Sequence, residues 1–178
     1  MQKPYNCILA RNIMIGELLN DEVLVTDSRS VSALHSKRSY GVVKEGTLHL
    51  SAIEATYLHE RGKLEIKIDD TTLSSGDLWR RLAGPDFSTR YTVYKDLRDK
   101  GYIVKTGFKY GCHFRVYRTS VEEHADYLVH AYKAPENIPA EALVRYVRLA
   151  HSVKKQMIIA LVDEESDINY YELARKRL

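Results

Sequence analysis

The sequence predicts an α/β protein of mixed α+β type, in which a small N-terminal α/β domain precedes a C-terminal domain whose mixed β-sheet packs against helices. Along the 178 residues, segments that alternate like strands are interleaved with segments of helical spacing. At residues 83–86, a glycine suited to a helix end is followed at once by a proline, which cannot continue a helix. We therefore expect two domains, 1–84 and 85–178, each large enough to bury a modest core.

The N-terminal half is predicted to contain a hairpin, a helix, a strand and a second helix. The hairpin turns at Asn20-Asp21, where polar turn residues interrupt an alternating pattern. Ser51 and Glu54 have the spacing of a capping box, which opens the first helix, and Gly62 ends it. The expected elements are a hairpin over 15–26, a helix over 51–61, a strand over 64–68 and a helix over 75–83.

The C-terminal half is predicted to run in the order helix, three strands, helix, two strands, which makes a mixed sheet. Gly101 ends the first helix, and Pro139 suits the first turn of the second. Residues 155–162 are mostly apolar, as is typical of a strand buried on both faces. The expected elements are helices over 88–100 and 139–151 and strands over 102–106, 112–117, 125–132, 155–162 and 168–173.

Composition excludes several protein classes. With 44% hydrophobic and 29% charged residues, the chain is too apolar for a disordered protein and too charged for a membrane bundle. No apolar run approaches the roughly 18 residues of a membrane helix, and Arg11 and Asn12 interrupt the only stretch that resembles a signal peptide. We therefore expect a cytoplasmic protein. Cys7 and Cys112 lack metal-like spacing, so we expect both to be small buried side chains.

Positive charge is concentrated in the second half. The first 84 residues carry 11 basic and 11 acidic side chains, so the net charge of +3 belongs to residues 85–178. Cations alternating with aromatic rings suit the recognition of single-stranded RNA. Taken alone this signal is weak, because most α/β domains carry solvated lysines and arginines on strand and helix faces, and that explanation is favoured. The densest stretch contains Lys95, Arg98, Lys100, Lys105, Lys109, Arg115 and Arg118, interleaved with Tyr102, Tyr110 and Tyr117.

A second basic cluster surrounds the end of the predicted helix over 139–151. Cations there are also favoured by the helix dipole, so a structural role and a ligand-binding role both remain open. In the preceding strand region, alternation places Phe114 and Val116 on the core face and Tyr117 on a polar face, seven residues before His124. The helix-end cluster consists of Arg145, Arg148, His151, Lys154 and Lys155.

Several blocks of the chain resemble one known family. The second half carries, in order, YKDLRDKGYIVKTGFKYG at 94–111, HFRVY at 113–117, EHADYLV at 123–129 and AHSVKK at 150–155. These blocks are similar to successive signatures of the archaeal tRNA-splicing endonucleases. LHLSAIEATYL at 48–58 and GKLEI at 62–66 resemble the N-terminal domain of the same family. The resemblance covers nearly the whole chain.

The resemblance implies a catalytic site and a chemistry. Tyr117 matches the family's general base, His124 its general acid, and Lys155 the cation that stabilises the phosphoryl oxygens. The implied reaction needs no metal or other cofactor: a 2′-hydroxyl attacks the adjacent phosphorus and leaves a 2′,3′-cyclic phosphate and a 5′-hydroxyl. Whether Lys154 assists Lys155 stays open. Arg148 matches an arginine that clamps a bulged nucleotide, and we expect Arg115 and Lys109 to contact RNA as well.

The resemblance also implies a substrate and an assembly. The substrate would be precursor tRNA with a bulge-helix-bulge motif, cut at both intron boundaries. The assembly would be a homotetramer, a dimer of dimers, in which an acidic turn enters a basic pocket of a neighbouring subunit. A heterotetramer with a second kind of subunit remains open. The turn contains Asp163, Glu164, Glu165 and Asp167.

Two other functions compete with this one. Glu65-Ile-Lys67 has the local form of a metal-dependent nuclease strand, although no upstream aspartate clearly completes that motif. A non-catalytic structural subunit of the same endonuclease would keep the fold and lack part of the catalytic triad. Because this chain retains Tyr117, His124 and Lys155, the sequence favours a catalytic subunit.

Overall fold

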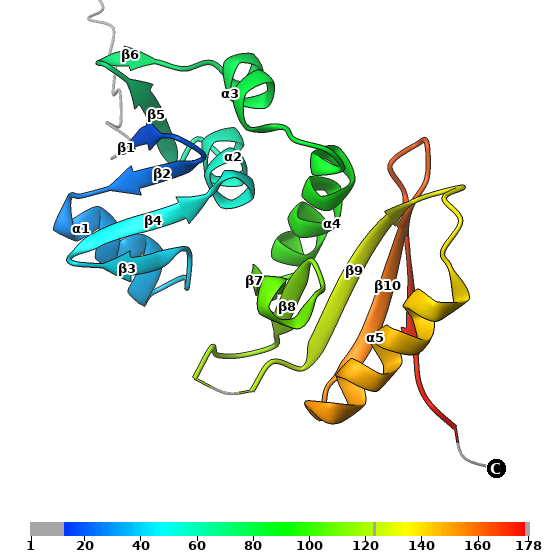
Figure 1. The fold of residues 1–178 in the computed structure, drawn as a ribbon. Helices are drawn as coiled ribbons and strands as arrows, with labels where there is room; N and C mark the ends of the chain where they lie inside the picture. Colours follow the sequence, from blue (N-terminus) through cyan, green and yellow to red (C-terminus); the bar gives the residue numbers. More distant parts are fainter. Residues whose placement is uncertain (1–12, 123, 177–178) are drawn as a thin grey trace, which may run out of the picture.

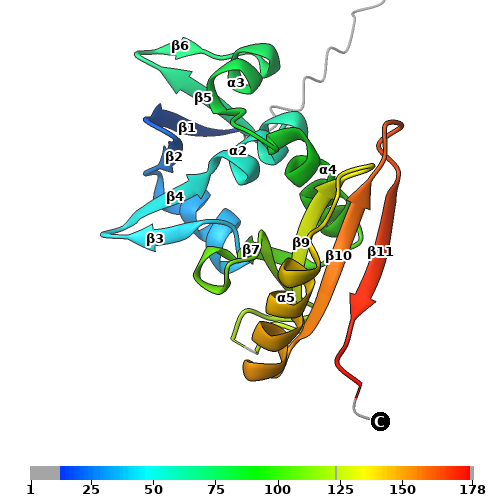
Figure 2. The same ribbon diagram turned by 45° about the vertical axis from the view of Figure 1, so that its right-hand side comes forward.

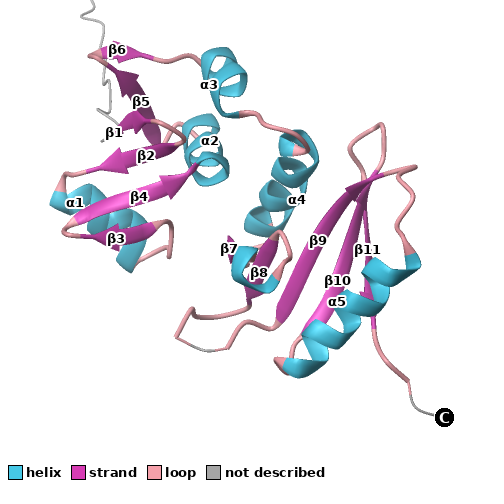
Figure 3. Cartoon of the chain, in the orientation of Figure 1, coloured by secondary structure: helices cyan, strands magenta, loops and turns pink. Residues whose placement is uncertain are grey.

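The computed structural model describes residues 13–122 and 124–176, and within them it contains two mixed β-sheets and five α-helices (Figure 1). The mixed α/β class predicted from the sequence is confirmed. Colouring by secondary structure shows one sheet on each side of the long helix α4 (Phe87–Asp99) (Figure 3).

The N-terminal sheet has six strands in the order β3-β4-β2-β1-β5-β6. The predicted hairpin is confirmed: β1 and β2 pair antiparallel across Asn20, whose φ of 55° lies in the left-handed region that a tight turn requires. β1 also pairs in parallel with β5, which makes the sheet mixed. The strands are β1 (Met14–Leu19), β2 (Glu22–Val25), β3 (Val42–Lys44), β4 (Thr47–Ser51), β5 (Leu64–Ile68) and β6 (Thr71–Thr72).

The N-terminal helices are α1 (Ser28–Val31), continued by a π-helical turn η1 (Ser32–Ser36), then α2 (Ala52–Glu60) and α3 (Ser75–Leu82). The predicted start of α2 is confirmed, since Glu54 accepts hydrogen bonds from the backbone N–H and the hydroxyl of Ser51, at 3.1 and 2.8 Å. The other oxygen of the same buried carboxylate accepts the N–H of Gly41 at 2.9 Å. Glu54 thus ties the start of α2 to the loop before β3.

The C-terminal half runs α4, β7, β8, β9, α5, β10, β11, which is the predicted order. Its five-stranded sheet has the order β11-β10-β9-β8-β7, and only β9 and β10 pair in parallel. Helix α5 forms the crossover that a parallel pair requires (Figure 2). The elements are β7 (Ile103–Thr106), a 3₁₀ turn η2 (Phe108–Tyr110), β8 (Phe114–Tyr117), β9 (Tyr127–Lys133), α5 (Ala140–Ser152), β10 (Gln156–Val162) and β11 (Ile168–Leu173).

The two helices of this half cover opposite faces of the sheet. Val129 and Ala131 of β9 belong to the same buried cluster as Tyr94 of α4, whereas the alternate residues Leu128 and Tyr132 pack with Tyr146 of α5. Because neighbouring residues of a strand point to opposite faces, each helix has its own face of the sheet. Cys112 is buried beneath α5, as predicted, while Cys7 lies outside the described residues.

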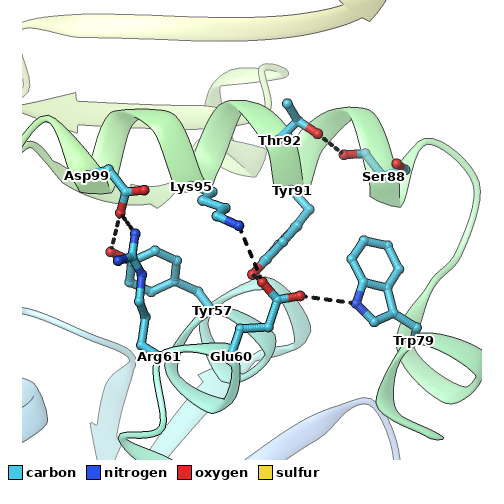
Figure 4. A network of polar contacts seen from close by, with 9 residues as sticks. All are labelled: Tyr57, Glu60, Arg61, Trp79, Ser88, Tyr91, Thr92, Lys95 and Asp99. Carbon is cyan, nitrogen blue, oxygen red and sulfur yellow. Dashed lines mark hydrogen bonds and ion pairs between the residues drawn. The ribbon is translucent and has the colours of Figure 1, made fainter. Parts of the chain in front are cut away.

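The two halves share one core and a polar network. The buried cluster that begins in the N-terminal sheet continues through α2 and α4 to the second sheet. Figure 4 shows Glu60 of α2 between Trp79, Tyr91 and Lys95, with its carboxylate accepting from Tyr91 at 2.6 Å and Trp79 at 3.3 Å. At the other end of this interface, Asp99 of α4 accepts from Tyr57 and Arg61. Among the described residues, no helix is both long and apolar enough to cross a membrane.

Candidate active site at one edge of the C-terminal sheet

Sheet topology brings the three predicted catalytic residues to the same edge. Strand β8 ends at Tyr117, and the antiparallel β9 begins beside that end. Strand β10 is parallel to β9, so it also begins there, directly after Lys155. Tyr127 of β9 is aligned with Val116 of β8 on one side and with Gln156 of β10 on the other. Tyr117 follows Val116 and Lys155 precedes Gln156, so both lie just past these aligned residues, at the same edge of the sheet. His124 lies in the loop that connects β8 to β9.

Tyr117 is buried, with a side chain that is only 6% exposed. It lies on the face of β8 that alternation assigned to polar residues, together with His113 and Arg115. His113 on this face is half-buried and stacks on His130 with ring centroids 3.9 Å apart. Polar residues on this face of β8 are therefore packed side chains. A base at Tyr117 would work in a restricted, partly dry environment.

His124 has the opposite environment. It is exposed and lies before β9, which begins at Tyr127, two residues later than predicted. When protonated, an exposed imidazole at this edge can give a proton to a leaving oxygen.

Lys155 is half-buried, and within residues 13–122 and 124–176 its side chain makes one hydrogen bond. Its Nζ donates to the carbonyl oxygen of Ala125 at 3.0 Å. Ala125 directly follows His124, so the ammonium is bound to the segment that carries His124. The end of α5 sets this position: Lys154 takes a φ of 53°, in the left-handed region, and the backbone N–H of Lys155 returns to the carbonyl of Ala150 at 2.9 Å. Because an ammonium has three donors, Lys155 keeps two for a phosphate.

Arg148 is exposed on α5 and lines a hollow of about 610 Å³. Arg175, from the segment after β11, lines the same hollow together with Leu143, Val144 and Val147. Sequence reasoning missed Arg175, because no motif or local pattern marks it; only the packing of the C-terminal segment near α5 brings it to Arg148. Two guanidinium groups at one hollow can hold a flat, anionic nucleotide between them.

The basic stretch between residues 95 and 118 is largely engaged by the protein itself. Lys105 donates to the carbonyl of Gly41 at 2.7 Å, and desolvation lowers its pKa. Arg98 lies 3.8 Å from the ring centroid of Tyr40. Arg115 donates to the carbonyl of Thr106 at 2.9 Å. These contacts favour the structural explanation for much of the stretch.

Lys109 and Arg115 are not brought to the catalytic edge within one chain. Lys109 is exposed in η2, which precedes β8, whereas Tyr117 ends that strand. Arg115 is half-buried beside the ring of Tyr110, 5.7 Å from its centroid.

The acidic turn lies between β10 and β11, at the end of β10 opposite Lys155. Asp163 is half-buried and organises the turn, because its carboxylate accepts the N–H groups of Glu165 at 3.0 Å and Asp167 at 2.8 Å. Glu164, Glu165 and Asp167 are exposed. Three of the four carboxylates are therefore available to a partner, while Asp163 has a role inside the turn.

Glu65 and Lys67, the residues of the alternative nuclease motif, lie on β5 of the N-terminal sheet. Their side chains pair with each other at 3.5 Å, and Glu65 also accepts the hydroxyl of Thr72 on β6 at 2.9 Å. The first contact joins neighbours on one face of β5 and the second joins β5 to β6, and nothing in them favours a metal-dependent reaction.

Comparison with known proteins decides the family. Residues 14–79 match the sequence model of the tRNA intron endonuclease N-terminal domain, and residues 87–170 match that of the tRNA intron endonuclease catalytic C-terminal domain. The chain is 44% identical over 165 residues to a tRNA-splicing endonuclease of Thermococcus kodakarensis, covering 90% of this chain and 97% of that protein. The chain belongs to the tRNA intron endonuclease family.

Other members of the family are similarly related. The chain is 43% identical over 157 residues to a tRNA-splicing endonuclease of Methanothermobacter thermautotrophicus, covering 86% of this chain and 92% of that protein. It is 36% identical over 185 residues to one of Methanococcus vannielii, covering 100% of this chain and 99% of that protein. Tyr117, His124 and Lys155 all fall in the part matched by the catalytic domain of the tRNA intron endonucleases, whereas Arg175 follows it.

Proposed function

We propose that this protein is a tRNA-splicing endonuclease, an enzyme that cuts precursor tRNA at both intron boundaries in a bulge-helix-bulge motif. The observation that carries the proposal is the meeting of Tyr117, the His124 loop and Lys155 at one edge of the C-terminal sheet. The names and near-complete coverage of the relatives support it.

The proposed chemistry is an internal transfer at phosphorus. Tyr117 acts as a phenolate: the 2′-hydroxyl gives its proton to the phenolate oxygen and attacks the adjacent phosphorus, which forms the new P–O2′ bond. The P–O5′ bond breaks, and His124 gives a proton to the departing 5′-oxygen. Lys155 uses its two remaining donors to stabilise the charge that develops on the phosphoryl oxygens. The products are a 2′,3′-cyclic phosphate and a 5′-hydroxyl, and the electron balance needs no metal.

RNA would be held outside the catalytic edge by basic side chains. We assign a bulged nucleotide to Arg148, and we add Arg175 because it lines the same hollow. Lys109 lies in η2, before β8, and Arg115 is the second residue of that strand, beside the ring of Tyr110. Both would contact RNA next to the bond that this subunit cuts rather than at it.

The proposed assembly is a homotetramer, built as a dimer of dimers. Each chain would divide at residues 84 and 85 into the two domains expected from the sequence. The acidic turn needs a basic acceptor, and a cleft of about 430 Å³ next to the α3–α4 connection offers one. Arg81, Arg90 and Lys105 line this cleft together with the carboxylates of Asp21 and Glu54. The three cations would draw the acidic side chains of another subunit's turn into it, namely Glu164, Glu165 and Asp167.

One assay tests the function. Purified protein alone, in EDTA, is mixed with an end-labelled precursor tRNA that contains an intron, and the fragment ends are analysed. We expect two cuts, with cyclic-phosphate and 5′-hydroxyl ends. Cleavage that requires Mg²⁺ would overturn the mechanism, and cleavage that requires a second kind of subunit would overturn the homotetramer.

A further inference from the structure

Asp126 joins the three segments that carry the proposed catalytic residues. Its backbone N–H donates to the carbonyl of Val116 at 2.9 Å, and its own carbonyl accepts the N–H of Gln156 at 3.1 Å. Val116 precedes Tyr117, and Gln156 follows Lys155. The main chain of this one residue therefore links the end of β8 to the start of β10.

The side chain of Asp126 closes the loop that carries His124. Its Oδ2 accepts the backbone N–H of Arg118 at 2.9 Å, across eight residues of chain. Arg118 directly follows Tyr117, and Asp126 lies two residues after His124. The hydrogen bond thus connects the residue next to the base with the segment that holds the acid.

The ion pair between the two side chains is a weaker contact. Arg118 Nε lies 3.7 Å from Asp126 Oδ1, at a partly exposed site where an ion pair contributes little. The guanidinium of Arg118 is directed to the hydroxyl of Tyr127, to which it donates. The contact that defines the loop is therefore the one between the Asp126 carboxylate and the backbone of Arg118.

The same strand start also supports Lys155. Ala125, the residue before Asp126, supplies the carbonyl that accepts from Lys155 Nζ. A displacement of residues 125 and 126 would move the acceptor of Lys155, the loop of His124 and the backbone beside Tyr117 together.

We propose that Asp126 is a positioning residue, whose carboxylate holds Tyr117 and His124 at a fixed separation on either side of the bond to be cut. The proposal rests on the proposed function. A base and an acid that act on opposite sides of one phosphorus must be held at a set distance, and misplacement by about 1 Å can cost about 10²-fold in rate.

The test compares Asp126→Ala with Asp126→Asn under single-turnover conditions. Alanine removes the acceptor, so we expect the cleavage rate at saturating enzyme to fall by about 10- to 100-fold, with unchanged RNA affinity. Asparagine keeps one acceptor oxygen for the Arg118 N–H and should recover most of the rate. Hydrogen exchange at the Arg118 amide should speed up in Asp126→Ala and not in Asp126→Asn.

Asp77→Ala is the matched control. Asp77 also accepts a nearby backbone N–H, that of Ser74 at 3.1 Å, but it does so at the start of α3, in the N-terminal half. We expect its loss to change the thermal unfolding temperature and not the cleavage rate. Equal rate losses in Asp77→Ala and Asp126→Ala would reduce Asp126 to a general stability role and overturn the proposal.

The remaining outcomes are also decisive. A normal rate in Asp126→Ala, or a loss that asparagine does not restore, overturns the positioning role. Tyr117→Phe is measured in the same assay. If this variant cleaves at the wild-type rate, the proposed active site is wrong. If Tyr117→Phe is inactive but Asp126→Ala cleaves normally, only the proposal for Asp126 is wrong.

Discussion

Tyr117, His124 and Lys155 differ sharply in their surroundings, and the difference suits their proposed roles. Tyr117 is 6% exposed, Lys155 is half-buried and His124 is exposed. A base acts on the 2′-hydroxyl within the RNA, so a packed and restricted phenol is appropriate there. An acid that must regain its proton after each turnover is better placed in contact with water.

Removing either proton-transfer group should slow cleavage without weakening RNA binding. We expect Tyr117→Phe and His124→Ala each to lower the single-turnover rate by at least about 10², because general acid and base groups contribute about 10²- to 10⁴-fold. Filter binding of the precursor checks that affinity is retained. Unchanged cleavage in either variant would remove that residue from the mechanism.

His113 and His130 form a half-buried, stacked pair beneath α5. Their rings stack at 3.9 Å, the Nδ1 of His113 accepts the N–H of Ala131 at 3.1 Å, and Tyr146 of α5 places its hydroxyl 3.2 Å from His130 Nε2. Among the described residues, Nδ1 of His130 is buried without a hydrogen-bond partner. Desolvation lowers the pKa of His113 to about 4 and that of His130 to about 3.

This pair should make the fold sensitive to mild acid. Unfolded histidines titrate near pH 6.5, above the folded pKa values, so the unfolded chain binds more protons as the pH falls. The contribution of these two neutral histidines to the free energy of unfolding is therefore fully present above about pH 6.5 and is lost as the pH falls towards 4. We expect the urea midpoint to drop from pH 7.5 to pH 5, and to drop less in the double variant His113→Phe/His130→Phe. An equal drop in both proteins would contradict the assignment.

The sequence can point to a functional or capping residue where a motif marks it. It cannot show how deeply that residue's side chain is buried or which side chains surround it. The sequence proposed Tyr117, His124 and Lys155 for the site through ordered blocks that resemble one family. Alternation put Tyr117 on the polar face of its strand, but it could not reveal that this side chain is only 6% exposed, because packing between segments distant in the chain leaves no local pattern. Arg175 escaped notice for the same reason.

The end of α5 shows how an element positions a side chain. The helix stops at Ser152, and the chain reverses through Lys154 before β10 begins. A left-handed conformation costs a non-glycine residue about 1–2 kcal/mol, so the reversal is maintained against a local preference. Lys154 itself is exposed, and its role relative to Lys155 can be separated by substitution.

Lys154→Gly should relieve that cost and leave cleavage intact. We expect the free energy of unfolding to rise by about 1 kcal/mol, because glycine adopts the left-handed region without steric penalty. Urea denaturation measures the gain, and the cleavage assay shows whether Lys155 acts alone. A fall in rate comparable to that of Lys155→Ala would mean that the two lysines share the role.

Elements with strong boundary signals were predicted well. The capping box of Ser51 and Glu54, the glycine after α4 and the proline before α5 fixed three helices to within about two residues. The short elements were missed, because two to five residues give too little periodicity to detect; they are β3, β4, β6, α1, η1 and η2. Gly41 helps to place β3: its φ is 58°, and a Cβ there would lie 2.5 Å from the carbonyl oxygen of His49.

At the scale of the whole molecule, the N-terminal and C-terminal halves pack against each other in addition to being connected by the chain. They share a continuous buried cluster and the two polar contact groups around Glu60 and Asp99. The order of elements in the catalytic half followed from the sequence, but this shared core did not, since contacts between distant segments leave no local pattern. The cleft of about 430 Å³ is lined by residues of both halves, so it exists only when the two halves are packed together.

Charge reversal in the acidic turn should divide the assembly. We expect the variant with Asp163, Glu164, Glu165 and Asp167 all changed to Lys to form dimers, because repulsion from Arg81, Arg90 and Lys105 would replace attraction at the cleft. Light scattering measures the mass. Glu164→Lys/Glu165→Lys is a second variant that keeps Asp163, which supports the turn internally. A tetramer that survives the fourfold reversal would remove the turn from the interface.

The parallel pairing of β9 with β10 has a consequence for how the protein is made. Domains of a growing chain fold from the N-terminus as they leave the ribosome. β10 follows Lys155 and is held in place only after α5 has crossed the sheet, so a nascent chain can already contain Tyr117 and His124 while the cation is still missing. The proposed active site can therefore form only after α5 and β10 have been synthesised and β10 has paired with β9.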